Sequence, residues 1–284
     1  MGERVNFLER LRAPERFLTL ELRPPRRDKG DDATISSWFD VNRSMRRLST
    51  LDTATFWTDS AVGVAEEENL QHLVSNLSED VPRDRICPFL TTKHSLEYCL
   101  WYAARALESG FPALTVLGGD KHVGPPRCVP HGYLLRQHIR ERYPQLALGG
   151  WANPHRDAQR QVDLLAAEEF TGEFYLTQIV SHHDLPAVEA FAKEAERRVP
   201  DLPGVFGVFY WRSANPKTLK RLSEFIPVNV QGILEDFESG LGPEEVCAKT
   251  IRALYDVGVR RVYISNLRTS EAAERLESIR QLLE

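Results

Sequence analysis

The sequence predicts a single (β/α)8 TIM barrel that spans residues 1–284. Three observations support this fold class. The chain has 284 residues, a usual size for one barrel. Short apolar, β-rich runs alternate with longer stretches of helical periodicity. No repeat, low-complexity tract or linker divides the chain. Such strand–helix alternation produces right-handed βαβ units and a parallel sheet.

Each predicted strand is a short apolar run that ends in polar or turn-forming residues. A weaker run, Ile226–Val230, is expected to be a short extra strand or part of a loop. Eight units without a second domain favour a closed barrel, and an open Rossmann-type sheet is the main alternative. The eight predicted strands are Phe17–Leu22, Ala54–Thr58, Ile86–Thr91, Ala113–Leu117, Leu146–Trp151, Glu173–Gln178, Val205–Tyr210 and Arg261–Ser265.

Four segments between or after the strands carry clear helix signals. Ser95–Ser109 begins with an N-cap serine and is followed by Gly110, a C-cap residue. Asp184–Arg197 begins with aspartate and has proline in its first turn. Pro243–Asp256 opens with proline and two glutamates, and Thr269–Leu283 is amphipathic. These segments fit the outer layer of a barrel.

The composition indicates a globular, cytoplasmic protein. With 42% hydrophobic residues and a net charge of −5, the chain can bury a large core and lacks the basic character of a nucleic-acid binder. No apolar run approaches the ~20 residues that cross a membrane, and the N-terminus lacks the apolar stretch of a signal peptide. The four cysteines form no C-x-x-C pair, which favours reduced thiols. The oligomeric state stays open.

Glu21 is the first candidate catalytic residue, because active sites of barrels lie at the C-terminal ends of the strands. It lies in Leu20–Pro25 (LELRPP), where two prolines stop the strand. A carboxyl group that faces the barrel mouth is partly desolvated, which raises its pKa and suits it to general-acid catalysis. A barrel-end ion pair with Arg23 or Arg26 is the structural alternative.

Asp120 is the second candidate, at the end of Thr115–Asp120 (TVLGGD). The preceding Gly118 and Gly119 let the backbone turn sharply and let a flat ligand approach closely. An aspartate that caps the following turn is the alternative interpretation.

Gln178 and three tryptophans are candidate binding residues at strand ends. The Gln178 amide both donates and accepts, so it can recognise the edge of a heterocycle, although a satisfied loop amide is the alternative. Trp57, Trp151 and Trp211 each follow or end a predicted strand. A single tryptophan is more often a core residue, but three near one mouth would form a stacking surface.

No metal site is predicted. His182 and His183 are adjacent, and adjacent residues on a turn rarely converge on one ion. There is also no H-x-x-x-H pattern or carboxylate triad. The chain lacks G-x-G-x-x-G, P-loop and G-x-S-x-G motifs, which excludes the usual dinucleotide, ATPase and serine-hydrolase patterns.

Five short segments, in order along the chain, resemble motifs of the methylenetetrahydrofolate reductase family. Leu20–Pro25 is similar to F-E-[LVF]-x-P-P, and Leu117–Asp120 to L-R-G-D. Thr171–Gln178 is similar to G-A-D-F-x-x-T-Q, Pro203–Val205 to P-G-[IV], and Asn266–Arg268 to L-N-R. The resemblance covers nearly the whole chain.

The resemblance implies a role for each matching residue. Glu21 would be the general acid that opens the methylene bridge of the substrate, a reduced folate. Asp120 would lie near the pterin and the redox centre, and Gln178 would bind the pterin. Asn266 and Arg268 would bind the substrate as well, Arg268 at its distal part.

The segments that hold FAD in this family are altered here. Phe89–Thr91 (FLT) replaces H-L-T, and Gly118 replaces an arginine. Ala166–Gly172 (AAEEFTG) is acidic where the family has a basic R-K-x-D-A-G stretch. Acidic side chains near a pyrophosphate oppose its binding. The chain therefore resembles the flavin-independent branch, with NADH or NADPH, rather than FAD, as the cofactor.

The expected reaction is the reduction of 5,10-methylenetetrahydrofolate to 5-methyltetrahydrofolate by hydride from NADH. Three alternatives stay open: an FAD-dependent reductase of the same substrate, a non-catalytic folate-binding partner subunit, and an unrelated barrel enzyme such as an aldolase that uses Lys93. The residues expected to contact the cofactor are Trp57, Thr91, Gly118, Gly119, Trp151 and Trp211.

Overall fold

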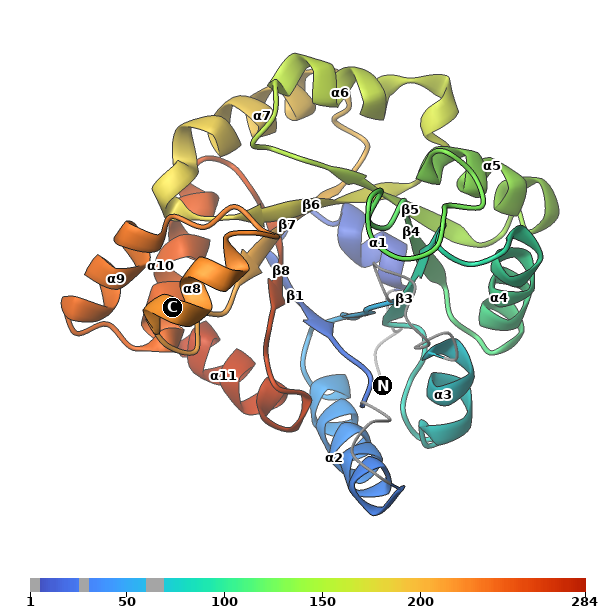
Figure 1. Ribbon diagram of the computed structural model, residues 1–284, viewed down its shortest axis with the longest axis horizontal. Helices are drawn as coiled ribbons and strands as arrows, with labels where there is room; N and C mark the ends of the chain where they lie inside the picture. The colour runs from blue at the N-terminus through green and yellow to red at the C-terminus, as the bar shows by residue number, and fades with distance from the viewer. Residues whose placement is uncertain (1–5, 26–30, 60–68) are drawn as a thin grey trace.

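The chain folds as one closed barrel of parallel strands, seen in a computed structural model that describes residues 6–25, 31–59 and 69–284 (Figure 1). Each strand pairs with the next, and the first pairs with the last, so the predicted (β/α)8 barrel is confirmed. The strands are β1 (Phe17–Leu22), β2 (Thr55–Trp57), β3 (Ile86–Thr91), β4 (Ala113–Leu117), β5 (Ala147–Ala152), β6 (Phe174–Val180), β7 (Gly204–Phe209) and β8 (Arg261–Ser265).

The helices surround the barrel, except for α1, which lies behind the strands in Figure 1. The connection from β7 to β8 holds α8, α9 and α10. The α-helices are α1 (Phe7–Arg12), α2 (Asp31–Ser49), α3 (Asn69–Asn76), α4 (Leu96–Glu108), α5 (Gly132–Arg142), α6 (Ala158–Ala166), α7 (Leu185–Arg198), α8 (Pro216–Leu222), α9 (Val230–Glu238), α10 (Pro243–Asp256) and α11 (Ala272–Leu283). The 3-10 turns are η2 (Glu168–Phe170), η3 (His182–Asp184) and η4 (Thr269–Glu271).

The strands β1, β3, β4 and β8 have the predicted bounds, and the other strands differ from prediction by one or two residues at each end. The run Ile226–Val230 is not a strand, since α9 begins at Val230. Ile226 and Val228 instead pack into an apolar cluster with Leu219 of α8 and Ile233 of α9. This packing buries their side chains without a ninth strand.

Aromatic side chains fill the barrel interior and close its N-terminal end. Phe7 of α1 lies with its ring centroid 5.8 Å from Phe56 and 5.5 Å from Phe174, both in edge-to-face geometry. Leu11, one helical turn further, is fully buried in the same cluster. Because α1 covers this end, the C-terminal end of the barrel is the end that a ligand can approach.

Two glycines in the strands make room for interior rings. A β-carbon at Gly207 would lie 2.4 Å from the Tyr263 ring, and one at Gly149 would lie 2.3 Å from the Phe174 ring. The Tyr263 hydroxyl donates to the Thr177 carbonyl at 2.6 Å. These rings form the floor beneath the barrel mouth, so the glycines are required for packing rather than for a turn.

β6 contains an irregularity near its C-terminal end. Its register with β7 shifts between Leu176 and Ile179. The Thr177 hydroxyl accepts the N–H of Gly207 at 3.1 Å, which replaces a regular ladder hydrogen bond. Bulges re-aim the side chains beside them, and Gln178 lies in this bulge.

Replacing Gly207 with alanine should destabilise the barrel, because the new methyl group overlaps the Tyr263 ring and the ring has no free space in which to move. We expect a loss of about 1–3 kcal/mol in the free energy of unfolding, measured by urea denaturation. Gly242→Ala is the matched control, since its β-carbon meets only Glu245 at 3.4 Å. Equal stability of the two variants would contradict the packing role of Gly207.

Candidate functional site

The closure of the barrel places Glu21 of β1 beside Ser265 of β8. Leu20 and Leu22 are buried between the strands and the outer helices, so alternation along β1 points Glu21 into the barrel. Pairing sets Leu20 opposite Ile264, which brings the following residues of the two strands together. The Ser265 hydroxyl donates to Glu21 Oε1 at 2.7 Å.

Burial raises the pKa of Glu21 above its ordinary value of 4.5. The hydrogen bond from Ser265 and the positive charge of Arg23 both lower this pKa, but the effect of burial is larger. Glu21 forms no ion pair within the described part of the chain, and Arg26 lies outside that part. The carboxyl group can therefore keep a proton to higher pH than a free glutamate and donate it to a ligand.

A cavity of about 490 Å³ opens beside Glu21. Its walls come from the end of β1, from α2 and from the segment that follows β8. The predicted substrate-binding residues Asn266 and Arg268 both line it. Arg23, which the sequence suggested only as an ion-pair partner of Glu21, lines it too, as does Arg212, to which the sequence patterns assigned no role. The structure thus brings together Glu21 and three guanidinium groups at the mouth, with Asp40 of α2 as a second carboxyl group in the lining.

Asn266 holds Arg212 at the cavity wall. Asn266 has a φ of +72°, a left-handed conformation that asparagine tolerates, and its Nδ2 donates to the Tyr210 carbonyl at 3.0 Å. Its own carbonyl accepts from Arg212 Nε at 3.0 Å and Nη2 at 2.6 Å. Burial and then the positive charge of Arg268 lower the pKa of Arg212, and Arg23 adds to this effect. An anion in the cavity would relieve this repulsion.

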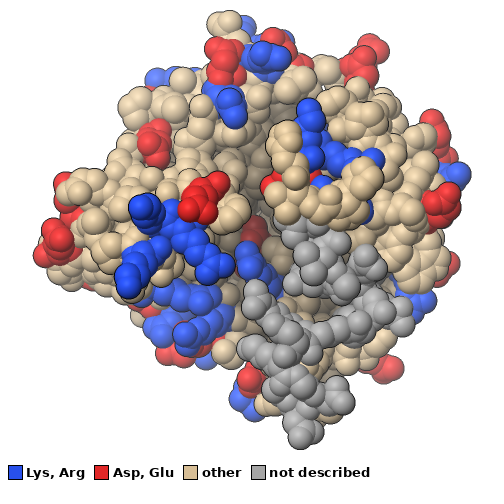
Figure 2. All heavy atoms as spheres, in the orientation of Figure 1, with Lys and Arg blue, Asp and Glu red and all other residues tan. Residues whose placement is uncertain are grey.

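The surface around this cavity is basic. Figure 2 shows Lys and Arg side chains gathered beside the hollow at the mouth, over α8 and the ends of β7 and β8. α8 carries Lys217, Lys220 and Arg221 within seven residues. This face attracts anions although the net charge of the chain is −5.

Asp120 and its two glycines have structural partners. Asp120 Oδ1 accepts the N–H of His122 at 2.8 Å, and this bond is the main reason for its lowered pKa. A β-carbon at Gly118 would lie 3.1 Å from the Arg127 guanidinium, which also donates to the Gly119 carbonyl at 2.5 Å. Arg127 thus fills the space beside Gly118 and binds the Gly119 carbonyl, which gives both glycines a structural role; their role in cofactor binding stays a prediction.

Only one of the three candidate tryptophans lies in the mouth. Trp151 is 38% exposed and shares the interior face of β5 with Gly149. Trp57 is 1% exposed, between the strands and the outer helices. Trp211 is 7% exposed and packs on Phe209, with ring centroids 4.4 Å apart, in the apolar cluster with α8 and α9. The prediction that Trp57 and Trp211 contact a ligand is therefore wrong, because both rings are buried.

Gln178 and Thr91 occupy different environments at the mouth. Gln178 is half-buried in the β6 bulge, and its Oε1 accepts the N–H of Ile179 at 2.9 Å. Thr91 is buried, and its N–H and hydroxyl both donate to Asp59 Oδ2, at 2.8 and 2.9 Å. His94 Nε2 lies 2.8 Å from the same oxygen. This hydrogen-bond network, which the sequence patterns did not indicate, links the end of β2 to β3. Both hydrogen-bond donors of Thr91 are used in this network.

Lys93 is not placed to act as a nucleophile. Its Nζ is buried and donates to the carbonyls of Val123, at 2.6 Å, and Pro125, at 2.8 Å. These two hydrogen bonds hold the amine against the backbone of the segment after β4, whereas a Schiff-base lysine must be free to attack the carbonyl carbon of a substrate. None of the eight strands contains a lysine. The structure therefore gives no support to the Schiff-base alternative.

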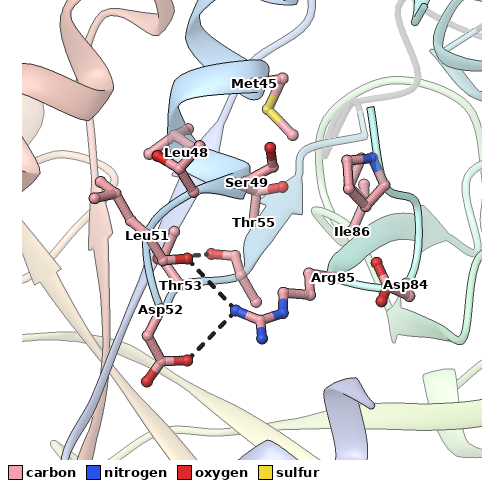
Figure 3. A pocket seen from close by; sticks show the side chains of 13 residues that line it. Met45, Leu48, Ser49, Leu51, Asp52, Thr53, Thr55, Asp84, Arg85 and Ile86 are labelled. Atoms are coloured by element: carbon pink, nitrogen blue, oxygen red, sulfur yellow. Dashed lines mark hydrogen bonds and ion pairs between the residues drawn. The ribbon is translucent and has the colours of Figure 1, made fainter. Parts of the chain in front are cut away.

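A second cavity, of about 310 Å³, lies at the opposite end of the barrel, where β2 and β3 begin. Figure 3 shows Arg85 reaching across it to Asp52 and to the carbonyl of Leu51, each at 3.4 Å. In barrel enzymes this end supports stability and the C-terminal end carries the site. We therefore assign the candidate site to the cavity beside Glu21.

The two adjacent histidines do converge. The ring centroids of His182 and His183 are 3.9 Å apart, and each Nε2 lies 3.0 Å from Asp236 Oδ2. The expectation that a turn would separate them is wrong. Asp236 is 53 residues from His183, so no local spacing pattern could have revealed this cluster.

Comparisons with known proteins show the fold alone. No family model and no curated protein matches the chain. An uncharacterised Clostridium thermocellum protein that binds two copies of 5-methyl-5,6,7,8-tetrahydrofolic acid is similar in structure, with a TM-score of 0.64, 14% identity, and coverage of 95% of this chain and 96% of that one.

Two lyase-type barrels are also similar. N-acetylneuraminate lyase from Mycoplasma synoviae has a TM-score of 0.52 and 11% identity, over 95% of this chain and 75% of its own. Dihydrodipicolinate synthase from Bacillus clausii has a TM-score of 0.51 and 11% identity, over 96% of this chain and 76% of its own.

These findings correct the expected membership in the methylenetetrahydrofolate reductase family and the expected NAD(P)H-dependent oxidoreductase activity. The similar structures are a folate-binding protein and lyase-type barrels, and no sequence match supports the reductase. The physical reason is visible in Leu117–Asp120, whose glycines accommodate Arg127 and whose aspartate caps a turn. Among the described residues, no helix is long and apolar enough to cross a membrane. The NADH, NADPH and FAD expectations stay untested.

The raised pKa of Glu21 predicts a specific pH dependence of stability. Below pH 4.5 the buried carboxyl is neutral in both folded and unfolded chains. As the pH rises through the folded-state pKa, the native state must bury a charge and loses stability. Glu21→Gln should therefore become more stable relative to the wild type as pH rises, measured by urea unfolding. Carboxyl NMR should place the Glu21 midpoint above 4.5, and higher still in Ser265→Ala. A midpoint at or below 4.5 would refute the assignment.

Proposed function

We propose that the chain binds a reduced folate at the C-terminal mouth of its barrel. The observation that carries this proposal is the pairing of a half-buried carboxyl group, Glu21, with a cavity lined by three arginines. A reduced folate has matching ends: a flat pterin with N–H donors and a glutamate tail with carboxylates. The pterin can be bound by a carboxyl group and an aromatic stacking surface, and the glutamate tail can be bound by cationic side chains.

The pterin is proposed to lie near Glu21 and Trp151. A carboxyl group accepts hydrogen bonds from adjacent N–H groups, and in its protonated form it can also donate one to a ring nitrogen. Trp151 is the exposed aromatic ring on the interior face of the barrel, and flat heterocycles stack on such rings. The Gln178 amide, in the bulge of β6, is a further candidate for the pterin edge. Asp120, ionised by its lowered pKa, would favour a cationic ring.

The glutamate tail is proposed to lie in the arginine-lined cavity. Guanidinium groups bind carboxylates in a bidentate manner. Arg212 is already held in place by the Asn266 carbonyl, so little side-chain entropy is lost when an anion binds. The cavity volume of about 490 Å³ falls within the range of small-molecule sites.

The similar protein from Clostridium thermocellum supports the choice of folate over other anions. It has the same fold along 95% of this chain, and it binds two copies of 5-methyl-5,6,7,8-tetrahydrofolic acid. The proposal concerns binding, which corresponds to the folate-binding alternative raised by the sequence. Lys93 is occupied by two carbonyl oxygens, so covalent catalysis by a lysine is not part of it.

Loss of a cavity arginine should weaken folate binding. We expect Arg212→Ala to raise the dissociation constant of 5-methyltetrahydrofolate about 10-fold or more, because a charge-assisted hydrogen bond is lost. Isothermal titration calorimetry measures this change, and high salt should weaken wild-type binding in the same direction. Arg12→Ala, on the exposed side of α1, is the control and should bind like the wild type. Equal affinities for all three proteins would reject the cavity as the tail site.

The mouth tryptophan should report binding. If the pterin stacks on Trp151, adding 5-methyltetrahydrofolate should quench part of the intrinsic fluorescence, and Trp151→Phe should remove most of that quenching. Trp151→Ala should in addition weaken binding, since the stacking surface is gone. Trp101 is similarly exposed, at 45%, but lies on α4 outside the barrel, so Trp101→Phe should leave the quenching intact. Quenching that depends on Trp101 would contradict the proposed pose.

A further inference from the structure

A compact cluster of metal-ligating side chains lies outside the barrel mouth, between η3, α9 and α10. It consists of His182 and His183 of η3 and Asp236 of α9, with one ligand atom of each within 4.8 Å of the others. Lys249 and Thr250 of α10 border it. The Asp236 side chain is 4% exposed, and those of His182 and His183 are 10% and 16% exposed.

Thr250 contacts the Nδ1 side of the His182 ring. The Thr250 hydroxyl has a single proton and lies 3.2 Å from the Val246 carbonyl and 2.7 Å from His182 Nδ1. When the hydroxyl donates to the carbonyl, it accepts from Nδ1. Nδ1 then carries the ring proton, and Nε2 carries a lone pair.

His182 Nε2 has no hydrogen-bond partner within the described part of the chain. The atom is buried, and although Asp236 Oδ2 lies 3.0 Å away, the contact does not meet hydrogen-bond geometry. The same carboxylate oxygen contacts His183 Nε2 at 3.0 Å. Two imidazole nitrogens and a buried carboxylate oxygen thus face one another, an arrangement that a cation between them would stabilise.

The second histidine reaches the cluster because α9 has a glycine opposite it. A β-carbon at Gly232 would lie 2.5 Å from His183 Nδ1, so a larger residue would displace the ring. Gly232 and Asp236 are four residues apart and lie on the same face of α9. A glycine inside a helix destabilises the helix by about 0.5–1 kcal/mol relative to alanine. At Gly232 the space needed by the His183 ring explains why glycine is present despite this cost.

We propose that His182, His183 and Asp236 form a binding site for a divalent transition-metal ion of the zinc type. Two imidazole nitrogens and one carboxylate oxygen are a common ligand set for such ions. Tetrahedral coordination with bonds of about 2.0–2.1 Å separates the ligand atoms by about 3.3 Å. Both nitrogen–oxygen distances here are 3.0 Å, and the ligand atoms of the three residues lie within 4.8 Å of one another. The fourth position would be filled by water or an external ligand.

Thr250 and Lys249 tune the proposed site in opposite directions. Thr250 contacts His182 Nδ1 and so orients the ring with Nε2 toward Asp236, the role that hydrogen-bond partners of metal-bound histidines have in general. Lys249 Nζ binds Asp236 Oδ1 at 2.6 Å, so its positive charge opposes the ion. The Lys249 side chain is 47% exposed and can turn into solvent when a metal binds. The ion would link the end of β6 to α9 and α10.

The test is a titration of the metal-free full chain with Co²⁺, followed by visible absorption, and with Zn²⁺, followed by calorimetry. The wild type should bind one equivalent, with the intense d–d bands of a tetrahedral cobalt site. Asp236→Asn and His182→Gln should lose this binding. His131→Ala, an exposed histidine at the start of α5, should keep it. Circular dichroism should show that each variant is folded before its binding is compared.

Two further variants leave the three metal ligands in place, so that they test the site even if substitution of a ligand unfolds the protein. Thr250→Val should weaken metal binding about 10- to 100-fold, because His182 loses its orienting partner. Lys249→Met should strengthen binding, because the competing charge is removed. Zn²⁺ should also raise the melting temperature of the wild type but not of Asp236→Asn. The proposal is overturned if the folded wild type binds no stoichiometric metal, or if Asp236→Asn binds as tightly as the wild type.

Discussion

The pairing of β1 with β8 is the interaction on which the rest of the structure depends. It joins the two ends of the chain, at Phe17–Leu20 and Arg261–Ile264, and turns an open sheet into a barrel. The same seam creates the candidate site, because Glu21 and Ser265 meet there and Arg23 and Arg268 follow them closely along the chain. Contacts between residues so far apart in sequence form only after a large loss of chain entropy. The β1–β8 pairing therefore closes the barrel and also forms the candidate site.

The electrostatics of the mouth follow from the packed floor beneath it. The fully buried Tyr263 ring packs over Gly207 and is close enough to Glu21 for the two side chains to interact electrostatically. Burial of Glu21 outweighs the charge of Arg23 in setting the pKa of the carboxyl. The Asn266 carbonyl holds Arg212 in place near the positive charges of Arg268 and Arg23. An anion that binds on this side of the cavity would therefore meet positive charge that is already positioned. A carboxyl group with a raised pKa beside a cationic cavity is suited to a ligand that has both ring N–H groups and carboxylates, such as a reduced folate.

The resemblance to a reductase family shows how strand-end motifs can mislead. Any barrel needs glycine, aspartate and proline where strands turn into loops, so short matches there can arise from turn chemistry alone. Gly118, Gly119 and Asp120 illustrate this, because Arg127 and the N–H of His122 account for all three. Glu21 and Arg268 are different: their side chains line a cavity at the end of the barrel where ligands bind.

Periodicity in the sequence was sufficient to determine the strands, their order and the end of the barrel that carries the site, because these depend on local pattern and on general rules of βαβ handedness. It did not determine which face a strand-end residue occupies, so Trp57 and Trp151 looked equivalent although one is buried and the other exposed. Only the tertiary structure brought Arg212 to Glu21, and Asp236 to His182, because such contacts depend on strand register and helix packing across distant parts of the chain.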